Sequence, residues 1–427
     1  MEVLINFESF RRYTVKIDRL VFGFLLIFSS VLVFSCPNKT NKESDTHTPS
    51  PSPNPNPKPD PEPVPAPVIP SDIAKDFVKV DPPETGIVGD STDLKFPEKD
   101  AYWRGVFVKN RTCKLTPFRM AKYETTYKVW KEVYDWAIKN QYKFSGAGRK
   151  GGAKQDKYTE AEHTEAEPVT NVTWSDCVVW CNAYTHKVVE KEDECVYTKD
   201  GETIKDATDE DLFVNMQPEW DKGGFRLPTE AEWEFSARYQ GEDAANAVKL
   251  GDFYYTRLDS ASGAKKPIGF KKLKYEGASK DNKALWDELK DELNRVSVYR
   301  AYFTGEDYGG NDFDDKGTGY ELISPEIVGT AVVGSKEPNT LGLYDMSGNV
   351  AEWVYDFFCD PPMPKEGEIE TDPVQASPFP NEFCVIKGAS WAGWSCDQLI
   401  GYRAGGQPHD QKDDQLGFRL VYRYKEK

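Results

Sequence analysis

Residues 342–353 read GLYDMSGNVAEW and residues 226–234 read RLPTEAEWE, and these two stretches decide the fold. The second stretch carries a complete helix start, because Thr229 can act as an N-cap and Glu232, three residues later, completes a capping box. The first stretch contains a Gly-Asn pair at residues 348–349, which is typical of a turn. We therefore expect a helix that begins just after Thr229 and, later in the chain, a tight turn between more apolar residues.

Two other segments predict helices from the spacing of their apolar side chains. Residues 125–138 place apolar and aromatic side chains at helical intervals, so that one face can be buried. A second helix is expected from about Ser175, with Cys177 and Cys181 on one side. Core packing is the better interpretation of these two cysteines, although together with His186 they could also indicate a metal site.

The rest of the body is rich in turn residues and short apolar runs. Residues 240–330 are rich in Gly, Asp and Lys and have the composition of an inserted loop region, with one helical stretch near residues 282–294. We therefore assign the chain to the α+β class, loop-rich with few short helices and strands. The body is expected at residues 100–427, after a transitional segment at residues 72–99.

Several segments, in the same order, resemble the formylglycine-generating enzyme family, also called the sulfatase-modifying factor family. Besides the two stretches quoted above, they are residues 118–126 (FRMAKYETT), 168–182 (PVTNVTWSDCVVWCN), 387–391 (KGASW) and 417–420 (GFRL). The matching segments together span about residues 100–425, and the two longest are too long to arise by chance. The resemblance implies a single-domain fold related to C-type lectins and low in regular secondary structure.

The resemblance also implies an activity that depends on copper. The family's enzymes use molecular oxygen to oxidise a cysteine of an unfolded sulfatase peptide to formylglycine, with a copper(I) ion held by two cysteines. Counted from KGASW, the matching positions here are Gly393 and Gln398, and neither offers the soft thiolate that selects copper(I). Cys396 is the only thiol between Ser390 and Arg403. Copper is therefore not expected, and Cys396 and Ser390 are the weak catalytic candidates.

A calcium site is the second implication of the resemblance. In the family, calcium binds a loop whose matching residues here are Asp345, Gly348, Val350 and Glu352. The first and last would bind through carboxylates and the middle two through main-chain carbonyls, and ligation by oxygen alone suits a hard cation. The alternative is that Asp345 and Glu352 only brace the Gly-Asn turn. Calcium is the cofactor that the sequence predicts.

The N-terminal residues predict export. Residues 1–19 carry four basic side chains, and residues 20–35 are uncharged and lead directly to Cys36. Such an apolar stretch is short for a bilayer span of about 20 residues, whereas a basic stretch followed by a short apolar one is typical of a secretory signal. The end of the stretch, VFSC, resembles the lipobox of bacterial lipoproteins, whose cysteine is lipidated. We predict a signal peptide at residues 1–35 and lipidation of Cys36, with a plain anchor or an ordinary cleaved signal as alternatives.

Residues 36–71 predict a linker between the lipid and the body. From residue 49 nearly every second residue is proline, a composition that cannot bury a core and favours the polyproline II conformation. Residues 49–70 would then span roughly 65–70 Å. A spacer is the better interpretation, and a ligand for domains with aromatic grooves is the alternative. The protein is therefore expected to be tethered to a bacterial membrane, at its periplasmic face or at the cell surface.

The net charge of the chain and the absence of the copper-binding cysteine pair narrow the possible functions. The chain has a net charge of -17, so it lacks the positive surface that binds a phosphate backbone, and nucleic acid is not an expected partner. We predict a non-oxidase binding module that presents a loop surface at residues 391–415 to a peptide, a glycan or a host protein. The residues expected on that surface are Trp391, Trp394, Gln398, Arg403 and His409. The alternative is an oxidase that converts a sulfatase cysteine to formylglycine.

Overall fold

The chain divides into two units, Met1–Pro63 and Val64–Lys427, and every described residue belongs to the second unit. The computed structural model describes residues 69–89, 105–109, 111–153, 159–209, 211, 216–266, 283–303, 320–322, 329–359, 367–375, 383–393, 395, 397–406, 408 and 410–423. Cys36, and the signal peptide and most of the linker around it, lie outside these residues.

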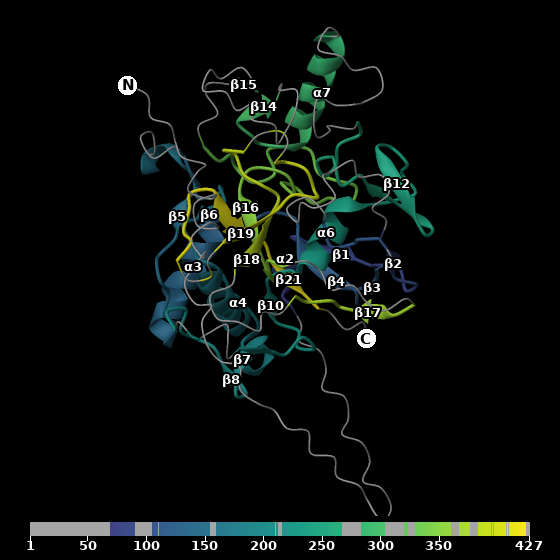
Figure 1. The fold of residues 1–427 in the computed structure, drawn as a ribbon. Helices are drawn as coiled ribbons and strands as arrows, with labels where there is room; N and C mark the ends of the chain where they lie inside the picture. Colours follow the sequence, from purple (N-terminus) through teal and green to yellow (C-terminus); the bar gives the residue numbers. More distant parts are fainter. Residues whose placement is uncertain are drawn as a thin grey trace, which may run out of the picture. The chain divides into compact units, whose positions relative to one another are not determined.

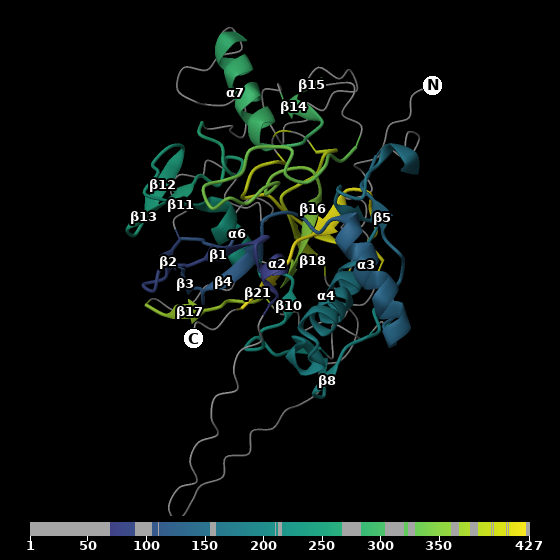
Figure 2. The same cartoon turned by 180° about the vertical axis from the view of Figure 1, so that it is seen from behind.

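The described helices are short and few. The α-helices are α2 (Ser71–Ala74), α3 (Tyr127–Ala137), α4 (Trp174–Val189), α6 (Glu230–Arg238) and α7 (Lys283–Val296), and the 3₁₀ turns are η2 (Ile138–Asn140), η3 (Glu160–Glu162) and η4 (Glu192–Glu194). Figures 1 and 2 show α3 beside α4, and α7 projecting from the other end of the body. The predicted helices near residues 125, 175, 229 and 282 are therefore confirmed.

The strands form several small sheets. One antiparallel sheet has the order β1-β4-β21-β10, made by Phe77–Val80, Phe118–Ala121, Val421–Tyr422 and Phe225–Arg226. A second has the order β19-β18-β16-β20, made by Arg403–Gly406, Cys384–Lys387, Ala351–Phe357 and Leu416–Phe418. In this second sheet β16 and β20 are parallel. All seven residues of β16 are buried, including the two carboxylates Glu352 and Asp356.

Five smaller sheets complete the described fold. The three-stranded ones are β11-β13-β12 (Tyr239–Gly241, Phe253–Thr256, Ala247–Leu250), β17-β3-β2 (Ile369–Thr371, Thr112–Lys114, Ile87–Val88) and β8-β7-β9 (Glu202–Thr203, Tyr197–Lys199, Gln217–Pro218). The two-stranded ones are β5-β6 (Arg149–Lys150, Val169–Thr170) and β14-β15 (Ala301–Phe303, Tyr320–Leu322). Sheets this small and this numerous match the predicted loop-rich α+β class.

Helix α6 begins as the sequence predicts but is buried on every side. Thr229 accepts a hydrogen bond from the Glu232 amide at 3.2 Å, and the Glu232 carboxylate accepts one from the Thr229 amide at 2.9 Å, which is a complete capping box. All nine residues of the helix are buried, including its three glutamates. The capping signal predicted where this helix begins, but it did not predict that every residue of the helix is buried.

Each buried glutamate of α6 has its own arginine. Arg403 binds Glu230 at 2.8 and 2.6 Å. Arg226 binds Glu232 at 2.7 and 2.6 Å. Arg238 binds Glu234 at 3.1 Å, and Glu234 also accepts the amide of Val106 at 2.6 Å. A buried carboxylate is tolerated only when it is paired in this way, so these contacts fix the helix in one position.

Aromatic side chains fill the core between the helices and the second sheet. The rings of Trp130 on α3 and Trp180 on α4 stack with centroids 5.6 Å apart, and Phe418 on β20 meets both of them edge-on. Cys177 and Cys181 lie in the same core cluster and are fully buried. Burial raises the pKa of both thiols well above the usual value. Both cysteines are therefore part of the packed core, the interpretation that the sequence favoured.

Two boundaries differ from the sequence prediction. The segment predicted as transitional contributes β1 and β2, which pair with β4 and β3, so it is part of the body. The region at residues 240–330, predicted as loop with one helix, also contains β11 to β15. Strands of three or four residues give too short an alternation to be recognised from sequence, which explains both misses. None of the helices in the described part of the chain is long and apolar enough to cross a bilayer.

Candidate functional site

The KGASW segment and the GLYDMSGN loop are joined by main-chain hydrogen bonds. The amide of Gly348 donates to the carbonyl of Gly388 at 2.8 Å, and the amide of Trp391 donates to the carbonyl of Asn349 at 2.8 Å. Gly388 and Gly348 have φ values of 87° and 89°, a conformation in which glycine carries no Cβ penalty. These bonds hold the KGASW segment, which follows β18, against the GLYDMSGN loop, which precedes β16.

The two positions that match the family's copper cysteines lie side by side. A methyl group at residue 393 would be 2.8 Å from Nε2 of Gln398 and 3.2 Å from the carbonyl oxygen of Ser390. Gln398 is 0% exposed, and its Oε1 accepts from the Ser297 hydroxyl at 3.0 Å while its Nε2 donates to the Ser390 carbonyl at 3.3 Å. The fold therefore brings both positions together, but a glycine and a hydrogen-bonded amide occupy them.

Ser390 and Trp391 tie two loops together. The hydroxyl of Ser390 donates to Oε1 of Gln415 at 2.9 Å, and the indole of Trp391 donates to the carbonyl of Asp414 at 3.2 Å. An amide oxygen cannot take up the proton of a nucleophile, so this contact does not activate Ser390. The two bonds link residues 390–393 to residues 413–415, the two ends of the expected ligand surface.

Three residues predicted for the ligand surface are instead buried. Arg403 is 0% exposed, and its guanidinium is used by Glu230 and by the carbonyl of Cys359 at 2.9 Å. Gln398 and Trp391 are also buried and support the loop from within. The prediction is corrected for these three side chains, because burial and internal hydrogen bonds direct them into the body. Trp394, Cys396 and His409 lie outside the described residues, so their predicted roles stay predictions.

An acidic pair in the second loop was not singled out from the sequence. Burial, and then the hydrogen bond and charge of Asp413, raise the pKa of Asp414 to about 7. Asp413 also accepts the amide of Gln415 at 3.0 Å. Asp414 therefore keeps its proton to a higher pH than an ordinary aspartate does. The only signal in the sequence is that two aspartates are adjacent.

The predicted calcium loop places Asp345 in a buried position. The Oδ2 atom of Asp345 accepts the amide of Gly334 at 2.6 Å, but its Oδ1 atom is buried and has no hydrogen-bond partner among the described residues. Burial raises the pKa of this carboxyl to about 6, although the Gly334 hydrogen bond and the charge of Arg419 oppose the shift. An unpartnered buried carboxylate oxygen is the feature that a hard cation would satisfy.

Glu352, the other predicted side-chain ligand of this loop, already has partners. Glu352 binds Arg419 through Nε at 2.8 and 2.7 Å and through Nη2 at 2.5 Å, and it accepts the Trp233 indole N–H at 2.8 Å. These contacts use the roughly four acceptor positions of a carboxylate. Gly348 and Val350 would bind only through their carbonyl oxygens. Among the described residues no three His, Cys, Asp or Glu side chains form a metal-binding group, so a calcium ion here would depend on those carbonyls.

Glu124 is a third carboxylate beside the loop, and the sequence did not single it out. It accepts the amide of Val350 at 3.0 Å and the side-chain amide of Asn349 at 2.6 Å. Burial and the charges of Asp345 and Glu352 raise the pKa of Glu124 well above its usual value. Three buried carboxyl groups thus surround one guanidinium, and a cation bound among them would favour their ionised forms.

The fold and these motifs define a member of the formylglycine-generating enzyme family. Residues 98–424 match the family model described as the sulfatase-modifying factor enzyme 1-like domain, so the chain belongs to this family. Among curated proteins the chain is similar to the chaperone protein LppX of Paenibacillus barcinonensis, with 26% identity over 310 residues, which are 72% of this chain and 80% of that protein.

Solved structures show a similar fold. The crystal structure of CarF has 23% sequence identity and a TM-score of 0.48, and the match covers 82% of this chain and 98% of CarF. The Treponema denticola variable protein 1 has 22% identity and a TM-score of 0.46, and the match covers 82% of this chain and 95% of that protein. At these identities the likeness concerns the fold alone.

Proposed function

We propose that this chain is a binding protein of the formylglycine-generating enzyme family that does not oxidise its ligand. The main support is that positions 393 and 398 lie together in the fold but are occupied by a glycine and a glutamine. Copper(I) in a two-sulfur site needs two thiolates, and an amide whose oxygen and nitrogen are both hydrogen-bonded cannot replace one. The scaffold of the family's site is then used for recognition alone.

The surface for the ligand is the one formed by the loops at residues 391–415. The buried contacts of Ser390, Trp391 and Gln398 hold these loops in place, so a recognition surface on them would be preorganised. Long loops on a rigid scaffold are where binding function usually lies. Trp394 and His409 are the residues proposed to contact the ligand.

The ligand that we propose is an unfolded or extended polypeptide. Two observations favour it over a glycan or a folded host protein. The family's enzymes act on an unfolded sulfatase peptide, and the similar protein LppX is named a chaperone. A module that keeps the peptide surface but lacks the copper thiols would bind such a segment without changing it.

We propose further that the protein is exported and held at a bacterial membrane by lipid on Cys36. The support is the lipobox-like VFSC sequence and the proline-rich linker after it. Labelling of cells with an alkynyl fatty acid should mark the wild type and leave Cys36→Ser unlabelled. Equal labelling of both would contradict the anchor, and it would leave the proposal for the loop surface untouched.

Calcium is proposed as a structural ion of the loop at Asp345, Gly348, Val350 and Glu352. The unpartnered Oδ1 of Asp345 and the cluster of buried carboxyl groups support it. Bound there, calcium would stabilise the turn that carries the KGASW segment. The ion would have no part in chemistry on the ligand.

The decisive experiment combines binding and chemistry on one sample. The full chain is incubated with copper(I), oxygen and a labelled peptide that carries the sulfatase CxPxR motif, and also with a reduced, carboxymethylated protein as an unfolded probe. Binding is followed by fluorescence anisotropy, and the peptide is then analysed by mass spectrometry. We expect binding of the unfolded probe with no aldehyde on the peptide.

Two results would contradict the proposal. Aldehyde on the peptide would show an oxidase, and absence of binding to both probes would remove the recognition function. Gln415→Ala should weaken binding, because it breaks one of the two hydrogen bonds that link the loops and leaves only the bond from Trp391 to the Asp414 carbonyl. Thr208→Ala, in an exposed turn after β8, is the matched control and should bind as the wild type does.

A further inference from the structure

Cys359, just after β16, is the one exposed cysteine among the described residues. The other five are Cys113, Cys177, Cys181, Cys195 and Cys384. All five are buried, and burial raises the pKa of each of their thiols. No disulfide joins any two of these six cysteines. A buried thiol that keeps its proton is inert, so within the described part of the chain a reagent in solution reaches a thiol only at Cys359.

A buried side-chain amide contacts this exposed thiol. The Sγ–H of Cys359 donates to Oε1 of Gln375 at 2.8 Å, and Gln375 is 8% exposed. The Nε2 atom of the same amide is buried and has no hydrogen-bond partner in the part of the chain that the structure describes. A buried N–H without an acceptor is costly. The amide of Gln375 therefore has one atom bonded to the thiol and one atom that lacks a partner.

A thiolate at Cys359 is the acceptor that Nε2 of Gln375 lacks. The oxygen and nitrogen of a primary amide are nearly the same size, so rotation of the amide by about 180° places Nε2 where Oε1 now lies, 2.8 Å from Sγ. Because Nε2 has no partner to lose, the rotation exchanges only the weak bond from the thiol for a stronger one to a charged sulfur. Gln375 can therefore bind the protonated form of Cys359 through oxygen and the ionised form through nitrogen.

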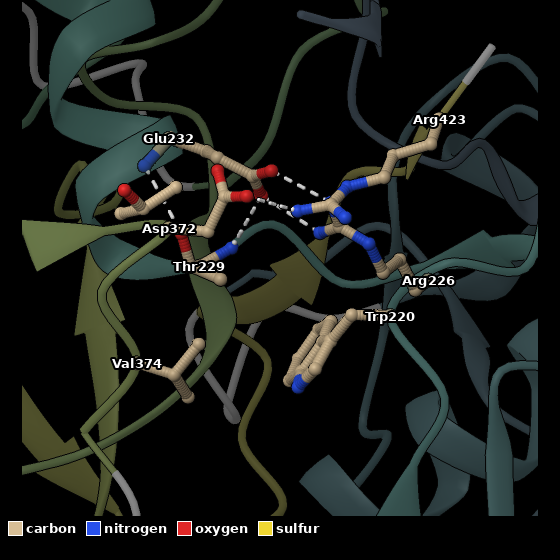
Figure 3. A pocket seen from close by; sticks show the side chains of 8 residues that line it. Trp220, Arg226, Thr229, Glu232, Asp372, Val374 and Arg423 are labelled. Atoms are coloured by element: carbon tan, nitrogen blue, oxygen red, sulfur yellow. Dashed lines mark hydrogen bonds and ion pairs between the residues drawn. The ribbon is translucent and has the colours of Figure 1, made fainter. Parts of the chain in front are cut away.

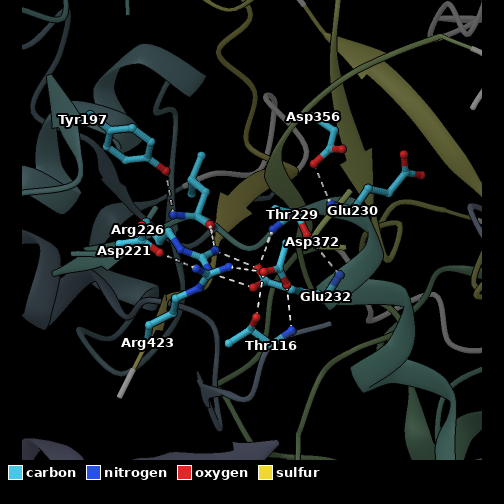
Figure 4. A network of polar contacts seen from close by, with 11 residues as sticks. Thr116, Tyr197, Asp221, Arg226, Thr229, Glu230, Glu232, Asp356, Asp372 and Arg423 are labelled. Atoms are coloured by element: carbon cyan, nitrogen blue, oxygen red, sulfur yellow. Dashed lines mark hydrogen bonds and ion pairs between the residues drawn. The ribbon is translucent and has the colours of Figure 1, made fainter. Parts of the chain in front are cut away.

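Main-chain hydrogen bonds fix the position of Gln375. Its amide N–H donates to Oδ1 of Asp356 at 2.8 Å, and its carbonyl accepts the amide of Phe357 at 2.9 Å. Asp356 is fixed in turn, because its Oδ2 accepts the amide of Glu230 at 2.7 Å (Figure 4). The backbone of Gln375 is thereby attached both to β16 and, through Asp356, to the start of α6.

The segment before Gln375 is held at its other end as well. Asp372 accepts hydrogen bonds from the amide and the hydroxyl of Thr116, each at 2.7 Å, and from Arg423 at 2.6 Å (Figure 4). Val374 packs against the core and lines a cavity of about 220 Å³ (Figure 3). Because the segment is fixed at Asp372 and at Gln375, the amide already lies beside the thiol, and little ordering cost opposes its bond to a thiolate.

The charged groups on the neighbouring elements largely cancel one another. Arg403 donates to the carbonyl of Cys359 at 2.9 Å, but its charge is balanced by Glu230, which it binds at 2.8 and 2.6 Å. Burial, and then the charge of Glu230, raise the pKa of Asp356 to about 7, so this carboxyl carries less than a full negative charge at neutral pH. The amide of Gln375 is therefore the group that favours the thiolate of Cys359.

We propose that Cys359 is a site of thiol–disulfide exchange, which forms a mixed disulfide with a partner molecule while the Gln375 amide stabilises the thiolate. Sγ of the thiolate attacks one sulfur of the partner's disulfide, and a new S–S bond forms as the partner's own S–S bond breaks. The other sulfur leaves as a thiolate and takes up the proton that Cys359 released. The sulfur of Cys359 is oxidised and the leaving sulfur is reduced, so the partner's disulfide is the oxidant.

This site is separate from the loop surface at residues 391–415 and does not depend on the polypeptide ligand proposed for that surface. Disulfides persist outside the cytoplasm, where the proposed export would bring the chain. A low-molecular-weight disulfide and a disulfide of another protein share the chemistry that the site requires, and the test distinguishes them.

The test is reaction of the full chain with two disulfides, oxidised glutathione and insulin. Peptide mass mapping under non-reducing conditions locates each adduct and separates Cys359 from Cys36 and Cys396. We expect a mixed disulfide on Cys359 with at least one of the two reagents, and no adduct at this position in Cys359→Ser. An adduct with glutathione alone supports a small disulfide as the partner, and an adduct with insulin alone supports a protein disulfide.

The role of the amide is tested with Gln375→Leu, which keeps the size of the side chain and removes its donor. The lost hydrogen bond should lower the thiolate fraction about tenfold, while the less stabilised thiolate is about threefold more nucleophilic. The rate of exchange with oxidised glutathione at pH 7 should therefore fall about threefold, and the rate–pH profile should move about one unit to higher pH. Gln375→Glu, whose carboxylate has no hydrogen to donate, should also slow the exchange.

A matched control is Gln240→Leu, which replaces another buried glutamine, in β11, and should leave the rate unchanged. Circular dichroism decides whether each variant is folded, and Gln375→Glu tests the amide even if Gln375→Leu does not fold. The proposal is overturned if Cys359 reacts with neither disulfide, if mass mapping of the untreated chain finds Cys359 already joined to another of its cysteines, or if both Gln375 variants keep the rate and the pH profile of the wild type.

Discussion

Replacing Gly393 by alanine tests the contact on which the proposed function depends. The added methyl group would lie 2.8 Å from Nε2 of Gln398 and 3.2 Å from the carbonyl oxygen of Ser390, both closer than a methyl carbon normally approaches. Gly393 is not among the glycines with positive φ, so the substitution acts through this contact and not through backbone strain. The amide of Gln398 has to move away.

The structure gives the expected size of the effect. Moving the amide breaks its hydrogen bonds to the Ser297 hydroxyl and the Ser390 carbonyl, and each neutral bond is worth about 1 kcal/mol. Gly393→Ala should therefore lower the free energy of unfolding by about 2 kcal/mol. Gln398→Ala loses the same two bonds and leaves a void, for about 2–3 kcal/mol. In the double variant the new methyl group enters that void, so the combined loss should fall short of the sum by about 1–2 kcal/mol.

Urea unfolding of the four proteins in the cycle measures this coupling. Gly146→Ala is the control, because its methyl group would meet no atom closer than 3.4 Å, and it should change stability by less than about 0.5 kcal/mol. If the two losses simply add within about 0.5 kcal/mol, residues 393 and 398 are not neighbours in solution. The reasoning that a glycine and a glutamine have replaced a thiol pair would then fail.

Three further substitutions test other parts of the structure. The pKa of the Asp345 carboxyl is raised from about 4 in the unfolded chain to about 6 in the folded one, so the stability of the wild type should fall as the pH rises from about 4 to 6. Asp345→Asn removes the ionised carboxylate, so it should raise the melting temperature in chelator at pH 7. If calcium binds there, the same variant should also lose any stabilisation by added calcium, and a wild type that melts identically in calcium and chelator would contradict the site. Arg403→Met removes both hydrogen bonds from the buried Glu230, which keeps only the Lys387 ammonium at 3.8 Å, and should cost about 3 kcal/mol in urea unfolding. A near-neutral result would return Arg403 to the ligand surface. Thr229→Ala breaks a complete capping box and should lower the free energy of unfolding by about 1 kcal/mol or more. Thr126→Ala should cost less, because the Thr126 hydroxyl accepts only one hydrogen bond, of 3.3 Å. The opposite order would refute the role of the capping box.

The helices were predictable because their signals are local. Thr229 and Glu232 lie within one turn, and the apolar spacing of residues 125–138 needs no knowledge of the rest of the chain. The strands were not predictable in the same way. In β1, Phe77–Val80, the partner is β4, some forty residues later, and a strand of this length has too few residues to show an alternation. Its assignment to the transitional segment at residues 72–99 followed from that lack of signal.

The candidate site was predictable in position but not in orientation. Counting from KGASW located residues 393 and 398, and the structure brings them together. The sequence could not show that Arg403 turns inward, because its partner Glu230 is 173 residues away. Nor could it show that the pKa of Asp414 is raised, since that depends on burial within the loop. Local spacing determines where a residue lies along the chain, whereas long-range pairing determines which way its side chain points.

The same distinction explains why the quoted motifs identify the fold and leave the function open. The two quoted stretches contain three buried glutamates, and each is paired with an arginine. Glu230 is paired with Arg403 and Glu352 with Arg419, both from distant segments, whereas Glu232 is paired with Arg226 at the start of its own stretch. A buried carboxylate without its arginine costs about 3–5 kcal/mol, a large fraction of the stability of a domain, so these residues are required by the fold itself. Residues 393 and 398 carry no such ion pair, and Gln398 is held by neutral hydrogen bonds to Ser297 and Ser390. The function therefore has to be sought in the loops, and only an assay of binding and oxidation on the intact chain can assign it.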